Sequence, residues 1–144
     1  MYGDRLKGKD YYRGGKLEFE GEYLFNNKWN GKGYDENDNI IYDLKNGNSN
    51  VKEYYYCKLE FVGEYLNGKR NGLGKKYYNG RLELIFEGAY LKGKRNGKGK
   101  EYDCYDGKLI FEGEYLNGVR NGKEKEYDDD KLIFEVEYLN GEKQ

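Results

Sequence analysis

The sequence of 144 residues contains no histidine, no proline and no threonine, and Ser49 is its only serine. Without an imidazole, and with a single aliphatic hydroxyl, neither a Ser–His–Asp triad nor a threonine nucleophile can be assembled. A cysteine nucleophile would also lack an imidazole to activate it. We therefore expect a protein without enzymatic activity.

Cysteine is scarce as well, since Cys57 and Cys104 are the only two. Two cysteines far apart in the sequence do not make the disulfide framework of a small secreted protein, so we expect reduced thiols. No apolar run approaches the roughly 20 residues of a membrane-spanning helix, and the first residues lack the apolar segment of a secretory signal. These absences favour a cytoplasmic protein, either free or attached at the surface of a membrane or of the cytoskeleton.

The chain also lacks an excess of charge of either sign, with 26 basic residues, 27 acidic residues and a net charge of −1. Nucleic-acid-binding proteins carry a clear basic excess, so no nucleic-acid partner is expected. Glycine and aromatic residues are abundant instead: there are 22 glycines, and 18 of the aromatic residues are tyrosine. This composition predicts a core built from rings rather than from leucine and isoleucine.

A repeat of 21 to 25 residues accounts for this composition. One unit, FEGEYLNGVRNGKEKEYDDDKLI, closely matches the unit before it, FEGAYLKGKRNGKGKEYDCYDGKLI. The aligned units begin at Phe19, Ile40, Phe61, Phe86, Phe111 and Phe134.

Within a unit, the segment F-E-G-E-Y-L alternates its side chains across a pleated strand. Phe111, Gly113 and Tyr115 therefore share one face, while Glu112 and Glu114 point to the other. Two Asn-Gly pairs supply the positive φ angles of reversing turns, and a second strand, K-G-K-E-Y, follows. The sequence predicts an all-β fold, an elongated single-layer antiparallel sheet of tandem β-hairpins with about 12 strands.

We interpret residues 1–144 as one repeat domain. It consists of a half repeat (1–18), the repeats 19–39, 40–60, 61–85, 86–110 and 111–133, and a final half repeat (134–144). The repeat 40–60 is degenerate, and we expect irregular strands there. It has Tyr42 at a glycine position, Leu44 at the tyrosine position, and Val51 where later units have Gly72 or Gly97.

The pattern F-x-G-x-Y-L-x-G-x-x-N-G-x-G-x-x-Y is carried by residues 61–77 and 86–102 and, in weaker form, by 19–34 and 111–127. It resembles the MORN repeat. The chain has tyrosine where many MORN repeats have tryptophan, and Asn-Gly where His-Gly is common. The resemblance implies a twisted sheet with a groove lined by the recurring aromatic residues, in a protein that acts as a scaffold, a membrane-contact protein or a module attached to an enzyme.

From this resemblance we expect a protein-interaction scaffold whose groove receives a helix or an extended segment of a protein partner. The candidate groove aromatics are Phe61, Tyr65, Phe86, Tyr90, Phe111, Tyr115, Phe134 and Tyr138. Trp29 lies outside this ladder and is a candidate anchor for a partner, or packs over the irregular second unit.

The alternative is a peripheral module that binds anionic phospholipid headgroups through a basic edge. The turns place Lys69, Arg70, Lys94, Arg95 and Arg120 along one edge of the predicted sheet, and the acidic loops lie along the other. Each cation near an anionic surface contributes about 1 kcal/mol before screening. The competing interpretation is a solvated edge that discourages strand pairing.

No cofactor and no metal ion are expected. Three G-x-x-x-x-G-K matches, which begin at Gly3, Gly63 and Gly88, lack the serine or threonine that would bind magnesium. The loop at residues 35–39 lacks the glycine and the closing glutamate of a calcium loop, and residues 128–130 form an acidic loop.

The two half repeats have a further consequence. The chain starts on a second strand and stops on a first strand, so both outer strands present unpaired backbone groups. We therefore expect that homo-oligomers can form through the terminal strands.

Overall fold

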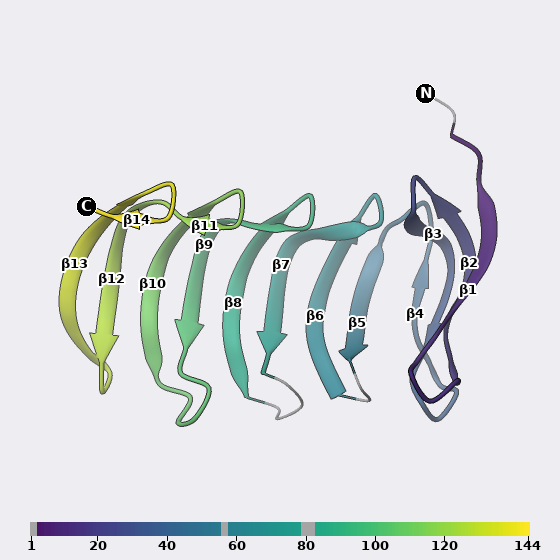
Figure 1. Cartoon of the computed structure of the whole chain (residues 1–144), viewed down its shortest axis with the longest axis horizontal. Coiled ribbons are helices and arrows are strands. Elements are labelled where there is room, and N and C mark those ends of the chain that lie inside the picture. Colours follow the sequence, from purple (N-terminus) through teal and green to yellow (C-terminus); the bar gives the residue numbers. More distant parts are fainter. Residues whose placement is uncertain (1–2, 56–57, 79–82) are drawn as a thin grey trace.

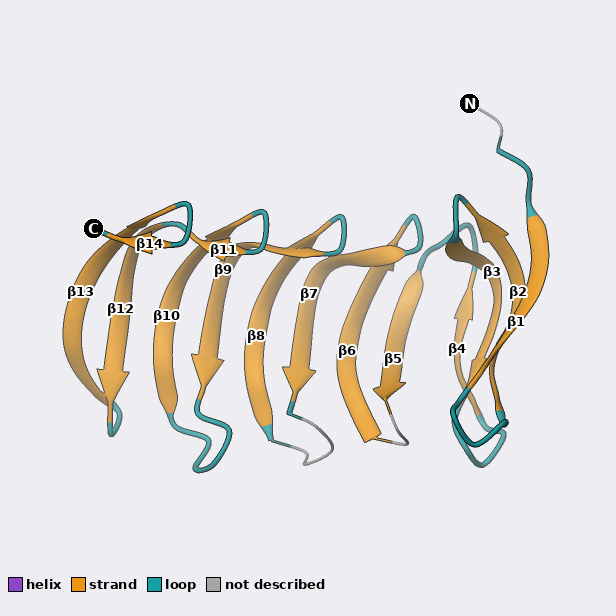
Figure 2. Cartoon of the chain, viewed as in Figure 1, coloured by secondary structure: helices purple, strands orange, loops and turns teal. Residues whose placement is uncertain are grey.

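The computed structural model describes residues 3–55, 58–78 and 83–144, and in these residues it contains strands and turns but no helix. Hairpins follow one another along the long axis of the molecule (Figures 1 and 2). The all-β class and the antiparallel hairpins are thereby confirmed. The strands are β1 (Leu6–Tyr11), β2 (Leu17–Leu24), β3 (Asn27–Tyr34), β4 (Ile40–Leu44), β5 (Ser49–Tyr55), β6 (Lys58–Leu66), β7 (Lys69–Tyr77), β8 (Leu84–Leu91), β9 (Lys94–Tyr102), β10 (Leu109–Leu116), β11 (Val119–Arg120), β12 (Gly122–Asp128), β13 (Lys131–Leu139) and β14 (Glu142–Lys143).

The hairpin of β6 and β7 shows how the repeat sequence forms its local structure. Leu66 lies opposite Lys69 in the ladder, and the two residues between them, Asn67 and Gly68, have φ angles of 53° and 75°. A two-residue hairpin turn needs positive φ at both central positions, and Asn-Gly is the pair that adopts it most readily. Tight turns of this kind line one edge of the array (Figure 2). The other edge carries longer loops, such as the one between β9 and β10, and a two-residue turn between β12 and β13.

Two facing glycines let the strands of a regular hairpin approach closely. Gly88 lies opposite Gly99, and a Cβ atom on Gly88 would lie 2.7 Å from the Cα atom of Gly99 and 2.8 Å from the Cζ atom of Phe86. Glycine is therefore required here for space, and the ring of Phe86 lies in the space that it leaves.

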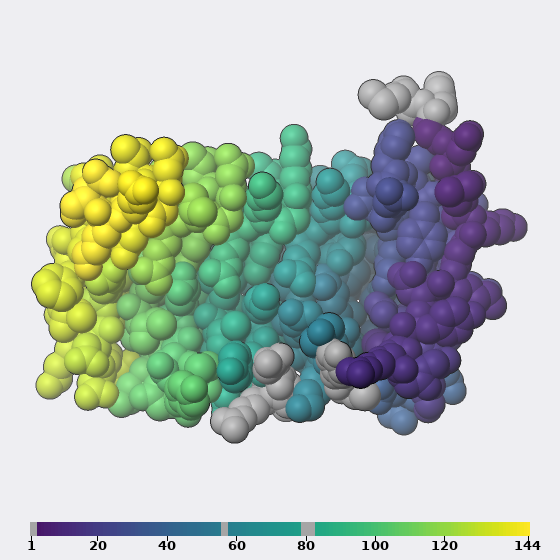
Figure 3. All heavy atoms as spheres, viewed as in Figure 1, coloured from purple at the N-terminus to yellow at the C-terminus, as the bar shows by residue number. Residues whose placement is uncertain are grey.

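The sheet is divided, whereas the sequence predicted one sheet of about 12 strands. Strands β1 to β4 form a four-stranded sheet and the remaining strands form a ten-stranded sheet, so the hydrogen-bonded ladder stops between β4 and β5. This division falls inside the degenerate repeat 40–60. The two sheets nevertheless adjoin in the space-filling view and share one cluster of buried side chains (Figure 3).

The cause lies in the residues that face the gap. Leu44 is opposite Gly31 and Val51 is opposite Gly63, so both occupy positions at which regular hairpins have facing glycines. When positions are assigned from the residues opposite them in the ladder, Leu44 rather than Tyr42 has the glycine position. This assignment corrects the alignment made from the sequence. Val51 likewise corresponds to Gly74 and Gly99, not to Gly72 and Gly97. Leu44 and Val51 are each 1% exposed, and their side chains fill the space that direct strand pairing would need.

Candidate functional site

The recurring aromatic residues form the core of the array. Each buried phenylalanine meets a tyrosine edge to face, as Phe86 and Tyr115 do with ring centroids 5.4 Å apart and an interplanar angle of 86°. The exposed fraction is 0% for Phe61, Phe86 and Phe111, 5% for Tyr90 and 4% for Tyr115. Tyr65 and Tyr138 are partly buried and pack against the same cluster.

The prediction that these side chains line an open groove is therefore wrong for the buried rings. A one-layer sheet was expected to leave one aromatic face open, but each ring is covered by the next repeat and by a cation. Phe134, on the outer strand β13, differs from the other repeat phenylalanines because it is 56% exposed.

Three of the five cations predicted to form a basic edge cover the rings. The guanidinium carbons of Arg70, Arg95 and Arg120 lie 4.2, 3.9 and 3.7 Å from the ring centroids of the phenylalanines of the same repeats. Such contacts combine cation–π attraction with burial of the guanidinium plane. The basic-edge prediction is therefore wrong for the arginines, whereas Lys69 and Lys94 are exposed at the turns.

A glutamate of the preceding repeat holds two of these arginines, Arg70 and Arg120. The carboxylate of Glu53 accepts hydrogen bonds from Nε and Nη2 of Arg70, at 2.9 and 2.5 Å, and from the hydroxyl of Tyr65 at 2.7 Å. We call this arrangement the Glu–Tyr–Arg contact. Burial raises the pKa of Glu53, but the hydrogen bonds and the charge of Arg70 lower it by more than burial raises it. The pKa of Glu53 therefore lies below its ordinary value.

The same contact recurs two repeats later. Arg120 donates from Nε and Nη2 to Glu101 at 3.2 and 3.0 Å, and the hydroxyl of Tyr115 donates to the same carboxylate. At the end of the array, Glu126 accepts from Tyr138 at 2.7 Å and from Lys143 at 2.9 Å. These contacts tie consecutive hairpins together at the level of side chains.

The boundary between the repeats 61–85 and 86–110 lacks the contact because a lysine replaces its glutamate. Lys76 lies opposite Phe61 and Phe86, the position that Glu101 has between Phe86 and Phe111. The hydroxyl of Tyr90 is buried there without a hydrogen-bond partner.

Glu124 is a second departure from the repeat pattern. It occupies the position of Gly99 and is 3% exposed, with both carboxylate oxygens buried and unpartnered. Its side chain lies over Gly113, where a Cβ atom would be 2.6 Å from the Cγ atom of Glu124. Burial raises the pKa of Glu124 to about 7.

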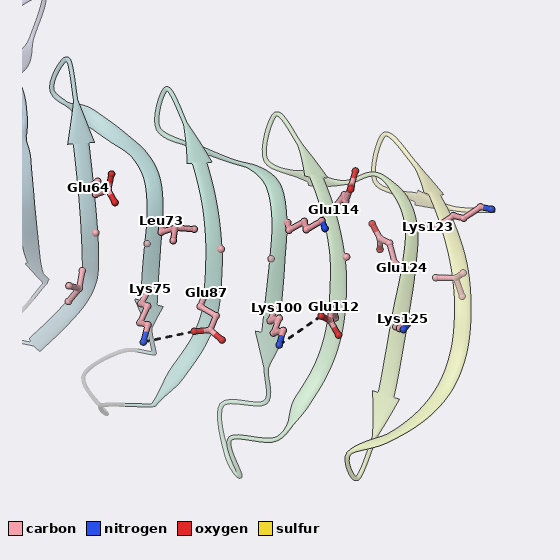
Figure 4. Close-up of a pocket in the computed structure, with 18 of the residues that line it drawn as sticks. Glu64, Leu73, Lys75, Glu87, Lys100, Glu112, Glu114, Lys123, Glu124 and Lys125 are labelled. Carbon is pink, nitrogen blue, oxygen red and sulfur yellow. Dashed lines mark ion pairs between the residues drawn. The ribbon is translucent and has the colours of Figure 1, made fainter.

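The face of the ten-stranded sheet opposite the aromatic core is hollowed by a groove of about 1040 Å³ (Figure 4). We call it the charged groove. Glycines form its floor, and charged side chains of successive strands form its sides. Its lining includes Val62, Gly63, Glu64, Leu73, Gly74, Lys75, Glu87, Gly88, Lys98, Gly99, Lys100, Glu112, Gly113, Glu114, Lys123, Lys125, Glu135 and Glu137.

Charges of opposite sign alternate from strand to strand in this groove. Lys75 of β7 lies 3.9 Å from Glu87 of β8, and Lys100 of β9 lies 3.8 Å from Glu112 of β10 (Figure 4). Leu73 interrupts the charges as an apolar side chain that is 70% exposed.

The sequence placed Glu112 and Glu114 on the face opposite the aromatic residues, but we did not predict a groove on that face. The signal that could have revealed it is the pairing of a lysine on each second strand with a glutamate on each first strand. Such pairing stabilises the ladder and leaves the glycine backbone between two rows of charge.

The remaining candidates lie apart from this groove. Trp29 of β3 is half-buried, and its indole Nε1 is enclosed without a partner, so its part in binding stays a prediction. The carboxylate of Asp35 accepts hydrogen bonds from the backbone N–H groups of Asn37 and Asn39, each at 2.9 Å, which is the geometry of a loop. Cys104 is a free thiol, and Cys57 lies outside the described residues.

Over residues 3–55, 58–78 and 83–144, no group of three or more acidic or cysteine side chains is placed to hold a metal ion. The same residues include no helix long and apolar enough to cross a membrane.

Comparison with known proteins agrees with this architecture. The MORN repeat family matches residues 61–80, 86–104 and 111–123, which begin at the phenylalanines of three consecutive hairpins. A search of curated proteins found no match to the chain. The matched segments contain the facing glycines and the buried phenylalanines and tyrosines described above, and the chain carries MORN repeats over these residues.

Proposed function

We propose that this protein is a non-enzymatic interaction module that holds a segment of a protein partner along the charged groove. MORN repeats are generally modules for interaction with proteins or membranes. The observation that carries the proposal for this chain is the groove itself, which runs across the ten-stranded sheet from Asn50 of β5 to Glu137 of β13.

The floor of the groove supports this assignment. Gly63, Gly74, Gly88 and Gly99 turn the positions of their missing side chains toward the rings of the core, so their backbone atoms form the floor between the charged side chains of neighbouring positions. Leu73, which is 70% exposed, offers an apolar contact at the same place. Concave surfaces with apolar contacts and a few polar groups are typical of binding sites.

The charge pattern indicates which partner would fit. Neighbouring strands are about 4.8 Å apart, so like charges recur along the groove about every 10 Å. A helix with a rise of about 1.5 Å per residue would meet like charges about every six or seven residues, and an extended segment about every three. We propose a partner segment with acidic and basic residues at one of these spacings.

The phospholipid alternative is less well supported. Arg70, Arg95 and Arg120 cover the core, so the exposed part of the proposed edge consists of Lys69 and Lys94. At about 1 kcal/mol per cation before screening, two lysines give little adsorption at physiological salt.

A charge exchange within the groove tests the proposal. Lys98 and Glu114 face each other in the β9–β10 ladder, so the double variant Lys98→Glu/Glu114→Lys keeps an opposite pair and the net charge while inverting the local pattern. We expect a partner captured from cytosol by the parent to be lost with this variant but retained with Lys69→Glu/Lys94→Glu. Retention with the groove variant and loss with the turn variant would contradict the proposal. Salt-sensitive sedimentation of the parent with anionic vesicles would then support the lipid alternative.

A further inference from the structure

The two outer strands of the array carry complementary halves of one repeat. In the described residues, β1 pairs only with β2, and residues Lys131 to Val136 of β13 pair only with β12. The backbone carbonyl of the next residue, Glu137, accepts a hydrogen bond from the N–H group of Gln144 at 2.9 Å. Strand β1 has the sequence of a second strand, and β13 has that of a first strand. The free side of β1 is the side on which a regular hairpin has its first strand. The free side of β13 is the side on which a regular hairpin has its second strand.

The exposed side chains at these edges match the missing parts. Phe134 of β13 is 56% exposed, whereas Phe61, Phe86 and Phe111 are 0% exposed. The rings of Phe61 and Phe86 lie against Gly74 and Gly99 of their own second strands. At Gly8 of β1, the three atoms nearest to an added Cβ atom would all belong to Tyr23 of the following repeat, so the space for a phenylalanine of its own repeat is open.

The charges match in the same register. In the β8–β9 hairpin, Phe86 is opposite Glu101, Glu87 is opposite Lys100 and Gly88 is opposite Gly99. Placing β1 of a second copy beside β13 in this register puts Phe134 opposite Asp10, Glu135 opposite Lys9, Val136 opposite Gly8 and Glu137 opposite Lys7.

A tyrosine supplies a further match. The hydroxyl of Tyr102 donates to Glu87 at 2.6 Å, and that of Tyr127 donates to Glu112 at 3.2 Å, each within its own repeat. Tyr11 has the same position in β1 and is 56% exposed. Glu135, at the other end of the chain, has the position of Glu87 and Glu112 and is the acceptor that Tyr11 of a second copy would meet.

We propose that a second copy of this chain adds its β1 to the free side of β13, head to tail, and so completes a MORN repeat between the two molecules. Strand β14 leaves room, because it pairs only with Tyr138 and Leu139, and residues 3–5 precede β1 without belonging to a strand. Like-with-like pairing is disfavoured, since two β13 strands bring Glu135 and Glu137 together and two β1 strands bring Lys7 and Lys9 together. Because the contact is heterologous, it can add further copies rather than stop at a pair.

Sedimentation velocity of the 144-residue protein, from micromolar to millimolar concentration, tests this proposal. We expect the average mass to rise past that of a dimer and to fall again at high salt. The variants Lys7→Glu/Lys9→Glu and Glu135→Lys/Glu137→Lys should each be monomeric alone and should associate when mixed in equal amounts. A parent that stays monomeric, a mass that levels off at a symmetric dimer, or folded variants that do not associate on mixing would each overturn the proposal.

A milder variant keeps the test decisive if charge reversal disturbs β1, where Lys9 also pairs with Glu20 at 2.9 Å. Tyr11→Phe removes only the hydroxyl and should weaken association roughly three- to tenfold without changing the melting temperature, since one hydrogen bond is lost at the contact. Tyr105→Phe, at a tyrosine that is 80% exposed in a loop, is the matched control and should have no effect. Equal association constants for the two variants would contradict the assigned register.

Discussion

At the scale of single residues, the arginine of each regular repeat closes the core of its own hairpin. Arg120 stacks on Phe111 at 3.7 Å and donates to Glu101 of the preceding repeat at 3.0 Å. Removing it exposes a ring and leaves a half-buried carboxylate without its cation. Both effects destabilise the fold.

We predict that Arg120→Ala lowers the free energy of unfolding by about 1–3 kcal/mol, as measured by urea denaturation. Lys94→Ala is the matched control, because this turn cation is exposed, and it should change stability by less than about 0.5 kcal/mol. If both variants matched the parent, the arginine would be a surface residue, as the sequence interpretation had it.

The buried carboxylate of Glu124 makes a prediction about pH. Its pKa in the folded protein is about 7, above the ordinary 4.5, so the folded state holds a proton that the unfolded state releases between these values. Stability from this group is fully present below pH 4.5 and is lost as the pH rises to about 7. We expect Glu124→Gln to be about 2–3 kcal/mol more stable than the parent at about pH 8 but of similar stability at about pH 4.

Denaturation of both proteins at the two pH values checks this expectation. The difference between parent and variant isolates Glu124 from glutamates such as Glu53, whose lowered pKa gives the opposite dependence. An equal difference at the acidic and the alkaline pH would show that the Glu124 carboxylate does not titrate in this range.

At the scale of the hairpin, glycine sets how closely two strands approach. A Cβ atom on Gly99 would lie 2.7 Å from Cε2 of Phe86 and 3.2 Å from Cε2 of Tyr115. We predict that Gly99→Ala destabilises the protein by about 1–3 kcal/mol through overpacking, read from its thermal unfolding. At Gly14 no atom lies within 4 Å of such a Cβ, so Gly14→Ala should be close to neutral. Similar losses for both variants would point to backbone entropy instead of packing.

The boundary between the repeats 61–85 and 86–110 lacks the Glu–Tyr–Arg contact. Lys76→Glu would give the buried hydroxyl of Tyr90 an acceptor and place a carboxylate beside Arg95. We predict a gain of about 1 kcal/mol in the free energy of unfolding, seen as a higher urea midpoint. Lys75→Glu, which faces Glu87 on the other side of the sheet, should not stabilise the protein. An unchanged or lower midpoint for Lys76→Glu would show that the contact adds nothing to stability.

At the scale of the whole molecule, the repeat made the hairpins, their turns and the antiparallel class predictable. The Asn-Gly pairs and the two-residue alternation of F-E-G-E-Y are local signals, and local signals fix local structure. What was not predictable depends on contacts between repeats. The division at Leu44 and Val51 depends on how closely neighbouring strands must approach, which no single strand reveals.

The candidate site shows the same limit. Sequence alternation correctly put the aromatic residues on one face and the charged residues on the other, but it could not show which face is filled. The rings are buried because Arg70, Arg95 and Arg120 reach back over them. The turn position of these arginines indicated exposure, whereas their long side chains extend inward over the phenylalanine rings.

Site-specific photo-cross-linking tests most directly whether the charged groove is the face that holds a partner. A photoreactive residue replaces Leu73 in the groove in one protein and Lys92 at the exposed turn edge in another, and each is irradiated with cytosol. We expect one cross-linked partner peptide at position 73, lost when Lys98 and Glu114 are exchanged, and none at position 92. Cross-linking of the same partner from position 92 but not from position 73 would contradict it.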